Sequence, residues 1–153
     1  MTVVKHGLQV EVELRVSVHK LWEALKSLNL LASKVAPNLT HQILEGDGGV
    51  GSLNLLQFGD GRYEKERVDI IDDSTHTLVA TVMTGGIDLS YHQYRKTVAL
   101  SPGRNGATTI ACWRAEYVPV AGSATPCGLV QDDALSFFKA LEAFLNANKN
   151  PYA

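Results

Sequence analysis

The feature that most constrains the fold of this chain is a series of strand-like segments that follow one another at hairpin distance. Six segments with strand character cover about residues 39–45, 52–58, 62–71, 76–83, 89–100 and 107–119. Turn-forming residues such as Gly59-Asp60-Gly61 and Gly85-Gly86 separate them. Because connections this short join neighbouring strands that run in opposite directions, the pattern predicts an antiparallel meander.

Further elements are predicted on both sides of this meander. In residues 4–16 apolar side chains occupy every second position from Leu8 to Val16, which predicts a half-buried strand. Ser17 can cap a short helix over about 18–27, and a second short helix follows near Leu30–Lys34. Near the C-terminus an apolar stripe at helical spacing predicts a long amphipathic helix over about 127–149.

Length, composition and charge narrow the class of protein. With 153 residues, 45% hydrophobic and 20% charged, the chain is expected to form one domain over residues 1–153. A formal net charge of −2 supplies no basic field for nucleic acid, and the two cysteines lack zinc-type spacing, so no metal or other cofactor is expected. With no signal-peptide run and no apolar stretch of membrane-spanning length, we expect a cytosolic monomer without a membrane partner.

Residues 45–51 read EGDGGVG and place four glycines in seven positions. A phosphate-binding loop needs a helix after it, whereas the residues after Gly51 have strand character and the Walker lysine is missing. A tight turn between two strands, with glycine supplying positive φ angles, explains the segment better. We therefore assign no ligand contact to this loop.

A curved antiparallel sheet covered by one long helix can leave an apolar hollow between the two layers. A single helix is too narrow to fill the width of seven strands. The predicted order of elements therefore points to this hollow as the functional site.

In its order of elements and in several short motifs the chain resembles the plant pathogenesis-related class-10 proteins, the birch-pollen-allergen family of the START-like helix-grip superfamily. The resemblance covers about residues 4–149 and rests on KVAP at 34–37, the glycine loop between strands, Arg67-Val68-Asp69, Gly85-Gly86 and Glu116-Tyr117. It implies an α+β helix-grip fold, with a seven-stranded curved antiparallel sheet around a long C-terminal helix and two short helices after the first strand. It also implies an internal cavity for small amphipathic plant molecules such as cytokinins, flavonoids or sterols, and a role in the plant cytosol.

Strand parity predicts which side chains face the hollow, because alternate residues of a strand point to the same side. The predicted ligand-binding set is Leu56, Phe58, Glu66, Val68, Leu78, Ala80, Val82, Tyr94, Trp113 and Tyr117, with Phe138 and Leu141 from the final helix. The same parity turns Asn54, Glu64, Ile70, Val98 and Leu100 inward. For each apolar residue, plain core packing is an equally good explanation.

Glu66 is the predicted polar anchor, because an inward carboxylate is costly unless a charge or a hydrogen bond compensates it. Relatives that bind cytokinin carry a carboxylate at a position that resembles Glu66. In the alternative, Glu64 and Glu66 pair with a lysine or arginine near the cavity mouth. Where many relatives have inward tyrosines before the double glycine, this chain has Leu78 and Ala80, so we expect a roomier and less polar cavity there.

The expected function is a non-catalytic carrier or sensor, with no catalytic residue assigned. The related norcoclaurine synthases use a cavity tyrosine, a carboxylate and a lysine, but this chain continues from Gly86 with Ile87 and has Arg114 where a titratable lysine is wanted. An isomerase or cyclase of plant specialised metabolism remains the alternative. A weak ribonuclease is disfavoured, since the glycine loop has no lysine and Asp47 repels phosphate. A small interaction module, with a filled cavity and an exposed apolar patch, is a third hypothesis. We expect His92 to be a surface or hydrogen-bonded histidine.

Overall fold

Strands and helices follow one another in the predicted order in the computed structural model, which describes residues 6–59, 61–86, 91–119 and 127–153. The described elements are β1 (His6–Leu14), α1 (Val18–Lys26), α2 (Leu28–Val35), β2 (Thr40–Glu45), β3 (Leu53–Gln57), β4 (Tyr63–Asp72), β5 (Thr77–Gly86), β6 (Tyr91–Pro102), β7 (Thr109–Pro119) and α3 (Cys127–Ala147). None of the described helices is both long enough and apolar enough to cross a membrane.

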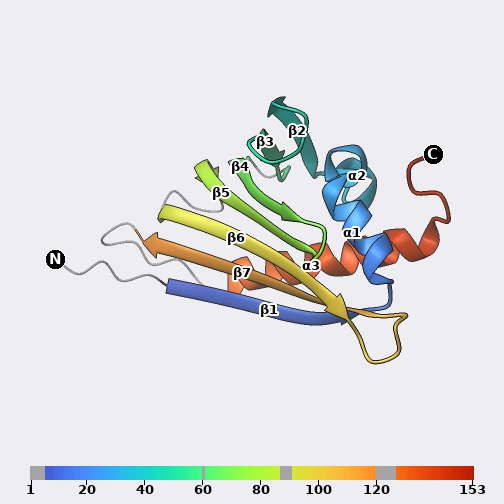
Figure 1. Ribbon diagram of the computed structural model, residues 1–153. Helices are drawn as coiled ribbons and strands as arrows, with labels where there is room; N and C mark the ends of the chain where they lie inside the picture. Colours follow the sequence, from blue (N-terminus) through green and yellow to red (C-terminus); the bar gives the residue numbers. More distant parts are fainter. Residues whose placement is uncertain (1–5, 60, 87–90, 120–126) are drawn as a thin grey trace.

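The strands form one seven-stranded sheet in the order β1-β7-β6-β5-β4-β3-β2, and every neighbouring pair is antiparallel. Figure 1 shows the sheet curving along α3, with α1 and α2 at the end nearest the C-terminus. The predicted helix-grip architecture is therefore confirmed. The side chains of Tyr91 and His92 and the segment 87–90, for which facing was ambiguous, lie outside the described part of the chain.

The main core lies between α3, the strands β1 and β7, and α1. Buried α3 residues recur at helical spacing on one face, at Ala134, Phe138, Leu141 and Leu145. Ser17 caps α1 by accepting a hydrogen bond from the Lys20 amide, as its position predicts. Because α3 packs most closely against β1, it leaves the β2–β5 side of the concave face less covered.

The glycine loop is the turn between β2 and β3. Gly46, Gly48 and Gly51 have φ angles of 90°, 94° and 89°, a region that suits glycine. The Gly48 amide donates to Ser52 Oγ at 2.8 Å, and the Gly51 amide donates to the Val68 carbonyl at 2.8 Å. The second bond ties the turn to β4, and the positive φ angles explain why so short a segment needs several glycines.

One parity prediction on β4 is wrong. Ile70, expected on the inner face, is 45% exposed, and Ile71 faces the inner side instead. The register between β4 and β5 shifts between Val68 and Ile70, so an extra residue is inserted at Asp69. A bulge of this kind reverses the facing of every residue beyond it, and local alternation of side chains does not reveal it.

Candidate ligand-binding cavity

A cavity of about 480 Å³ lies between the concave face of the sheet and the three helices. This volume falls within the range of about 300–1,000 Å³ that is typical of small-molecule sites. Among the residues that the structure describes, its walls come from every strand except β1, together with α1, α2 and α3. The hollow predicted from the order of elements is therefore present in the fold.

Nine of the twelve residues predicted from the sequence lie on the cavity wall. They are Leu56, Phe58, Glu66, Val68, Leu78, Ala80, Tyr94, Trp113 and Phe138. Three lie in the packed core outside the cavity lining. Val82 and Leu141 pack in the main core, and Tyr117 stacks on Tyr94 with ring centroids 6.5 Å apart. For these three the structure shows core packing, the alternative that parity left open.

A buried ion cluster, which strand parity did not single out, lies on the wall. Lys96 of β6 places its Nζ 2.6 Å from Glu64 Oε2 and 2.7 Å from Glu66 Oε2 on β4. The lysine can reach across β5 because its cross-strand neighbour there, Ala80, is small. The two carboxylates are thus paired with a lysine, as in the alternative considered for Glu64 and Glu66. A signal for Lys96 did exist, since it shares the parity of Tyr94 and Val98.

The carboxylates of this cluster stabilise the charged form of Lys96. Burial by itself lowers the pKa of Lys96, but the carboxylates of Glu64 and Glu66 outweigh burial and raise the pKa above its usual range. Lys96 therefore stays a cation at any physiological pH. The carboxylates of Glu64 and Glu66 together offer more hydrogen-bond acceptor sites than the three N–H groups of Lys96 can fill.

Unpaired polar atoms lie next to the cluster. Among the described residues, Glu66 Oε2, Asn54 Oδ1 and both ring nitrogens of His41 are shielded from solvent without a hydrogen bond. Glu66 Oε2 is near Lys96 Nζ, but their angles do not suit a hydrogen bond, so we count this contact as an ion pair only. Sequence reasoning missed His41, because the short β2 shows little alternation.

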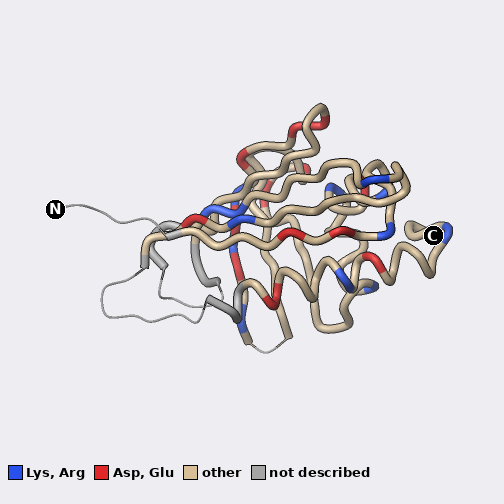
Figure 2. The backbone as a smooth tube through the Cα atoms, turned by 90° about the horizontal axis from the view of Figure 1, so that it is seen from below, with Lys and Arg blue, Asp and Glu red and all other residues tan. Residues whose placement is uncertain are grey.

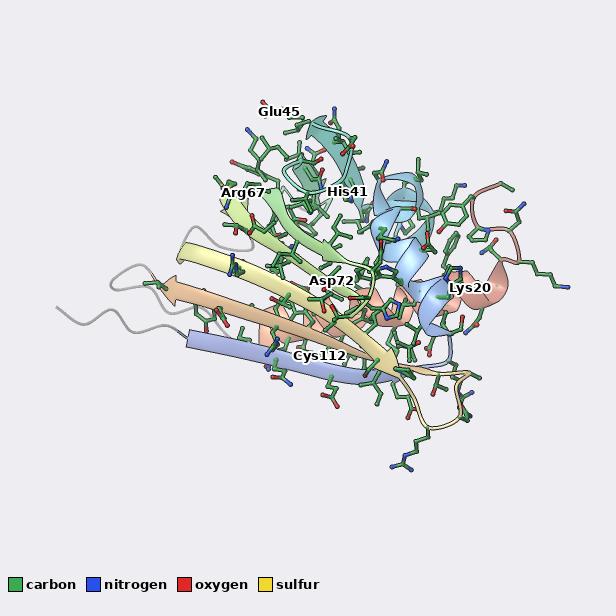
Figure 3. All side chains as sticks on the ribbon, in the orientation of Figure 1. Lys20, His41, Glu45, Arg67, Asp72 and Cys112 are labelled. Carbon is green, nitrogen blue, oxygen red and sulfur yellow. The ribbon has the colours of Figure 1, made fainter. Side chains whose placement is uncertain are left out.

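His41 is neutral at physiological pH. Burial lowers its pKa to about 4, the positive charge of Lys96 adds to this effect, and the nearby Asn54 amide opposes it. Figure 3 labels His41 between β2 and the helix α2. The Asn54 side chain is within hydrogen-bonding distance of the imidazole, but the angles between the two groups do not suit a hydrogen bond, so both ring nitrogens keep their hydrogen-bonding capacity.

An ion pair joins the start of β4 to α3 at the cavity wall. Arg62 Nη1 lies 3.3 Å from Asp133 Oδ2, and the guanidinium lies over the Phe58 ring at 5.6 Å. All three residues line the cavity, as does Gly48 of the glycine loop, to which the sequence analysis assigned no contact. Among the described residues, no group of three or more His, Cys, Asp or Glu is arranged to hold a metal ion.

Sheet, gripped helix and internal cavity together define a protein of the helix-grip class. The model of the pathogenesis-related protein Bet v 1 family matches residues 3–148. The chain therefore belongs to the Bet v 1 family, as the resemblance of its motifs indicated.

Curated relatives and solved structures agree with this assignment. MLP-like protein 423 of Arabidopsis thaliana is 28% identical over 145 residues, covering 90% of this chain and 92% of its own length. Pathogenesis-related protein B of Petroselinum crispum is 30% identical over 150 residues, covering 92% and 96%. Among solved structures, ginseng major latex-like protein 151 from Panax ginseng has a TM-score of 0.81 at 19% identity, covering 91% of this chain and 96% of its own. Truncated norcoclaurine synthase from Thalictrum flavum has a TM-score of 0.76 at 18% identity, covering 97% and 98%. At these identities the two structures show a shared fold.

Proposed function

We propose that this protein binds a small amphipathic plant molecule, such as a cytokinin-like compound, a flavonoid or a sterol, and acts as a cytosolic carrier or sensor. The observation that carries the proposal is the 480 Å³ cavity, whose wall is largely apolar and includes a few convergent polar groups. Ligand sites of small-molecule binders have this composition, because apolar walls supply affinity and a few polar groups supply orientation.

Glu66 is the proposed anchor for a ligand N–H or hydroxyl group. Its carboxylate is buried and held near Lys96, yet Oε2 retains acceptor capacity. The apolar part of the ligand would lie against Phe58, Trp113 and Phe138, which line the same cavity. Glu66→Gln is expected to weaken a ligand that bears a donor by about 1–3 kcal/mol, the value of an impaired hydrogen bond to a charged group. Unchanged affinity by calorimetry would rule out the anchor role.

A macromolecular partner is not part of the proposal. The chain has a formal net charge of −2, and Figure 2 shows its Lys and Arg residues interspersed with Asp and Glu in the described part. This distribution supports the absence of a nucleic-acid-binding surface. The monomeric state stays a prediction, which size-exclusion chromatography with light scattering can test.

Catalysis in the same cavity is the second candidate function, and Lys96 is the observation that favours it. Arg114 stands where this chemistry needs a titratable lysine on the last strand, but β6 supplies a lysine beside two carboxylates and near Tyr94. Norcoclaurine synthase from Thalictrum flavum shares the fold and has been solved with dopamine and hydroxybenzaldehyde. However, a lysine acts as a base or nucleophile only as the free amine, and the pKa of Lys96 is raised, so the carrier function is better supported.

Titration with the neutral fluorescent dye N-phenylnaphthylamine tests the proposed site, followed by displacement with a cytokinin, a flavonoid and a sterol. Leu78→Trp would fill part of the cavity, whereas Ile70→Trp places the same side chain on the exposed face. We expect the first variant to lose dye binding and the second to keep it. If both variants bind the dye equally well, the dye does not bind in this cavity. Product formation from amine and aldehyde precursors, followed by mass spectrometry, would favour the enzyme.

A further inference from the structure

His41 and Asn54 form a pair of polar residues that the proposed anchor does not use. They come from adjacent strands, β2 and β3, and Asn54 lies opposite Glu66 in the register of β3 and β4. His41 lies opposite Leu56, which itself faces Glu64 across the next strand pair. The polar residues therefore form a band across the concave face, from β2 to β6, and every member lines the cavity.

The unpaired atoms of this band need an explanation. Buried polar atoms in native proteins are nearly always hydrogen-bonded, and an unpaired one destabilises the fold. Leucine at either position would pack against Leu56 and its neighbours without such a loss. The imidazole and the amide on the cavity wall therefore have hydrogen-bonding capacity that a molecule entering the cavity can use.

The two side chains together have a defined hydrogen-bonding character. A neutral imidazole offers one N–H donor and one lone-pair acceptor, and an amide offers an oxygen acceptor and two N–H donors. The χ2 torsions of His and Asn are broad, so modest rotation can turn these shielded atoms toward the cavity. Lys96 repels a cation at His41, whereas Glu64 and Glu66 disfavour an anion nearby, so the best complement is a neutral group.

We propose that His41 and Asn54 form a second polar subsite, which selects ligands whose neutral head group carries a hydrogen-bond donor beside an acceptor, as a cyclic lactam does. An amide side chain pairs with such a group through two parallel hydrogen bonds, in the way that asparagine reads adenine. Glu66 then accepts from a separate donor on the ligand. This inference rests on the proposed function, since it requires a ligand in the cavity.

A matched pair of probes tests the subsite. Carbostyril is a flat bicyclic lactam with N–H beside C=O, and N-methylcarbostyril lacks the donor but keeps the apolar surface. Each probe would compete with N-phenylnaphthylamine for the wild-type protein. We expect carbostyril to bind about tenfold more tightly, the effect of about one hydrogen bond.

Three variants locate the preference. Asn54→Leu and His41→Leu remove the polar groups, and Gln42→Leu makes the same kind of change on the exposed side of β2. The first two should bind both probes with affinities within about threefold of each other, while Gln42→Leu keeps the tenfold preference. Circular dichroism checks that all three variants are folded, and Gln42→Leu, whose side chain lies outside the cavity wall, should keep the wild-type dye affinity.

The outcomes separate this inference from the proposed function. If the wild-type protein binds the dye but does not distinguish the two probes, the subsite is wrong and the carrier function stands. If the preference persists in both Asn54→Leu and His41→Leu, the selectivity comes from other residues and the inference also fails. If the dye does not bind the wild-type protein in the cavity, the proposed function fails, and the subsite fails with it.

Discussion

Replacing Lys96 by methionine would remove the cation from the Glu64–Lys96–Glu66 cluster while keeping nearly the same side-chain length. Two carboxylates would then remain buried next to each other on β4 without a compensating charge. We expect a loss of stability at neutral pH, because an unpaired buried charge is far costlier than a paired one.

The size of the effect follows from the contacts. At separations of 2.6 and 2.7 Å, each ion pair has a Coulomb energy of about 6 kcal/mol at an effective dielectric constant of about 20. Desolvation of the three ions offsets much of this energy, and the Lys96 side chain keeps 20% of its exposure, which screens it further. The net loss in Lys96→Met is therefore about 3 kcal/mol, at the low end for a broken buried pair.

Urea unfolding followed by circular dichroism measures this loss, with Lys139→Met as the matched control. Lys139 is exposed and its ion pair with Glu142 is long, 3.9 Å, so the control should change stability by less than about 1 kcal/mol. The triple variant Glu64→Gln, Glu66→Gln, Lys96→Met removes all three charges and should recover most of the stability.

The pH dependence gives a second readout. In Lys96→Met the folded state gains by taking up a proton between the two carboxylates, so its deficit against wild type should shrink as pH falls from about 7 to about 5. A loss below about 1 kcal/mol at neutral pH would refute the argument that the cluster is a tightly coupled buried unit. A larger loss that does not depend on pH would indicate that packing of the lysine chain matters, and not its charge.

Three further predictions concern His41, the glycine loop and Phe138. The pKa of His41 is about 4 in the folded state and about 6.5 in the unfolded chain, so protonation of the unfolded chain lowers the free energy of unfolding as pH falls from 6.5 towards 4. His41→Leu should remove up to about 3 kcal/mol of this acid destabilisation, measured by urea unfolding across the same pH range. Gly46→Ala would place a Cβ 2.5 Å from Ser52 Oγ at a φ of +90°, and should lower stability by about 2 kcal/mol, whereas Gly51→Ala meets no atom within 4 Å and should show a smaller fall in melting temperature. Phe138→Ala removes a side chain that is 1% exposed and should cost about 3–5 kcal/mol by urea unfolding; a change below about 1 kcal/mol would mean that the cavity wall collapses to fill the gap.

The elements and their order were predictable from the sequence, because periodicity and turn chemistry are local properties of the chain. The strands, the glycine turn between β2 and β3, and the apolar stripe of α3 all lie where alternation and helical spacing indicated. Parity within a single strand was equally informative on β7, where Ala111, Trp113, Ala115 and Tyr117 are all buried.

Only the tertiary structure decided which side chains meet. Ile70 turns outward because of a bulge on β4, and Lys96 can reach Glu64 and Glu66 because its neighbour on β5 is the small Ala80. Such contacts depend on the register between strands, and the sequence of one strand alone does not determine that register. The cavity has the same origin, since its volume is the space left unfilled after distant elements have packed together.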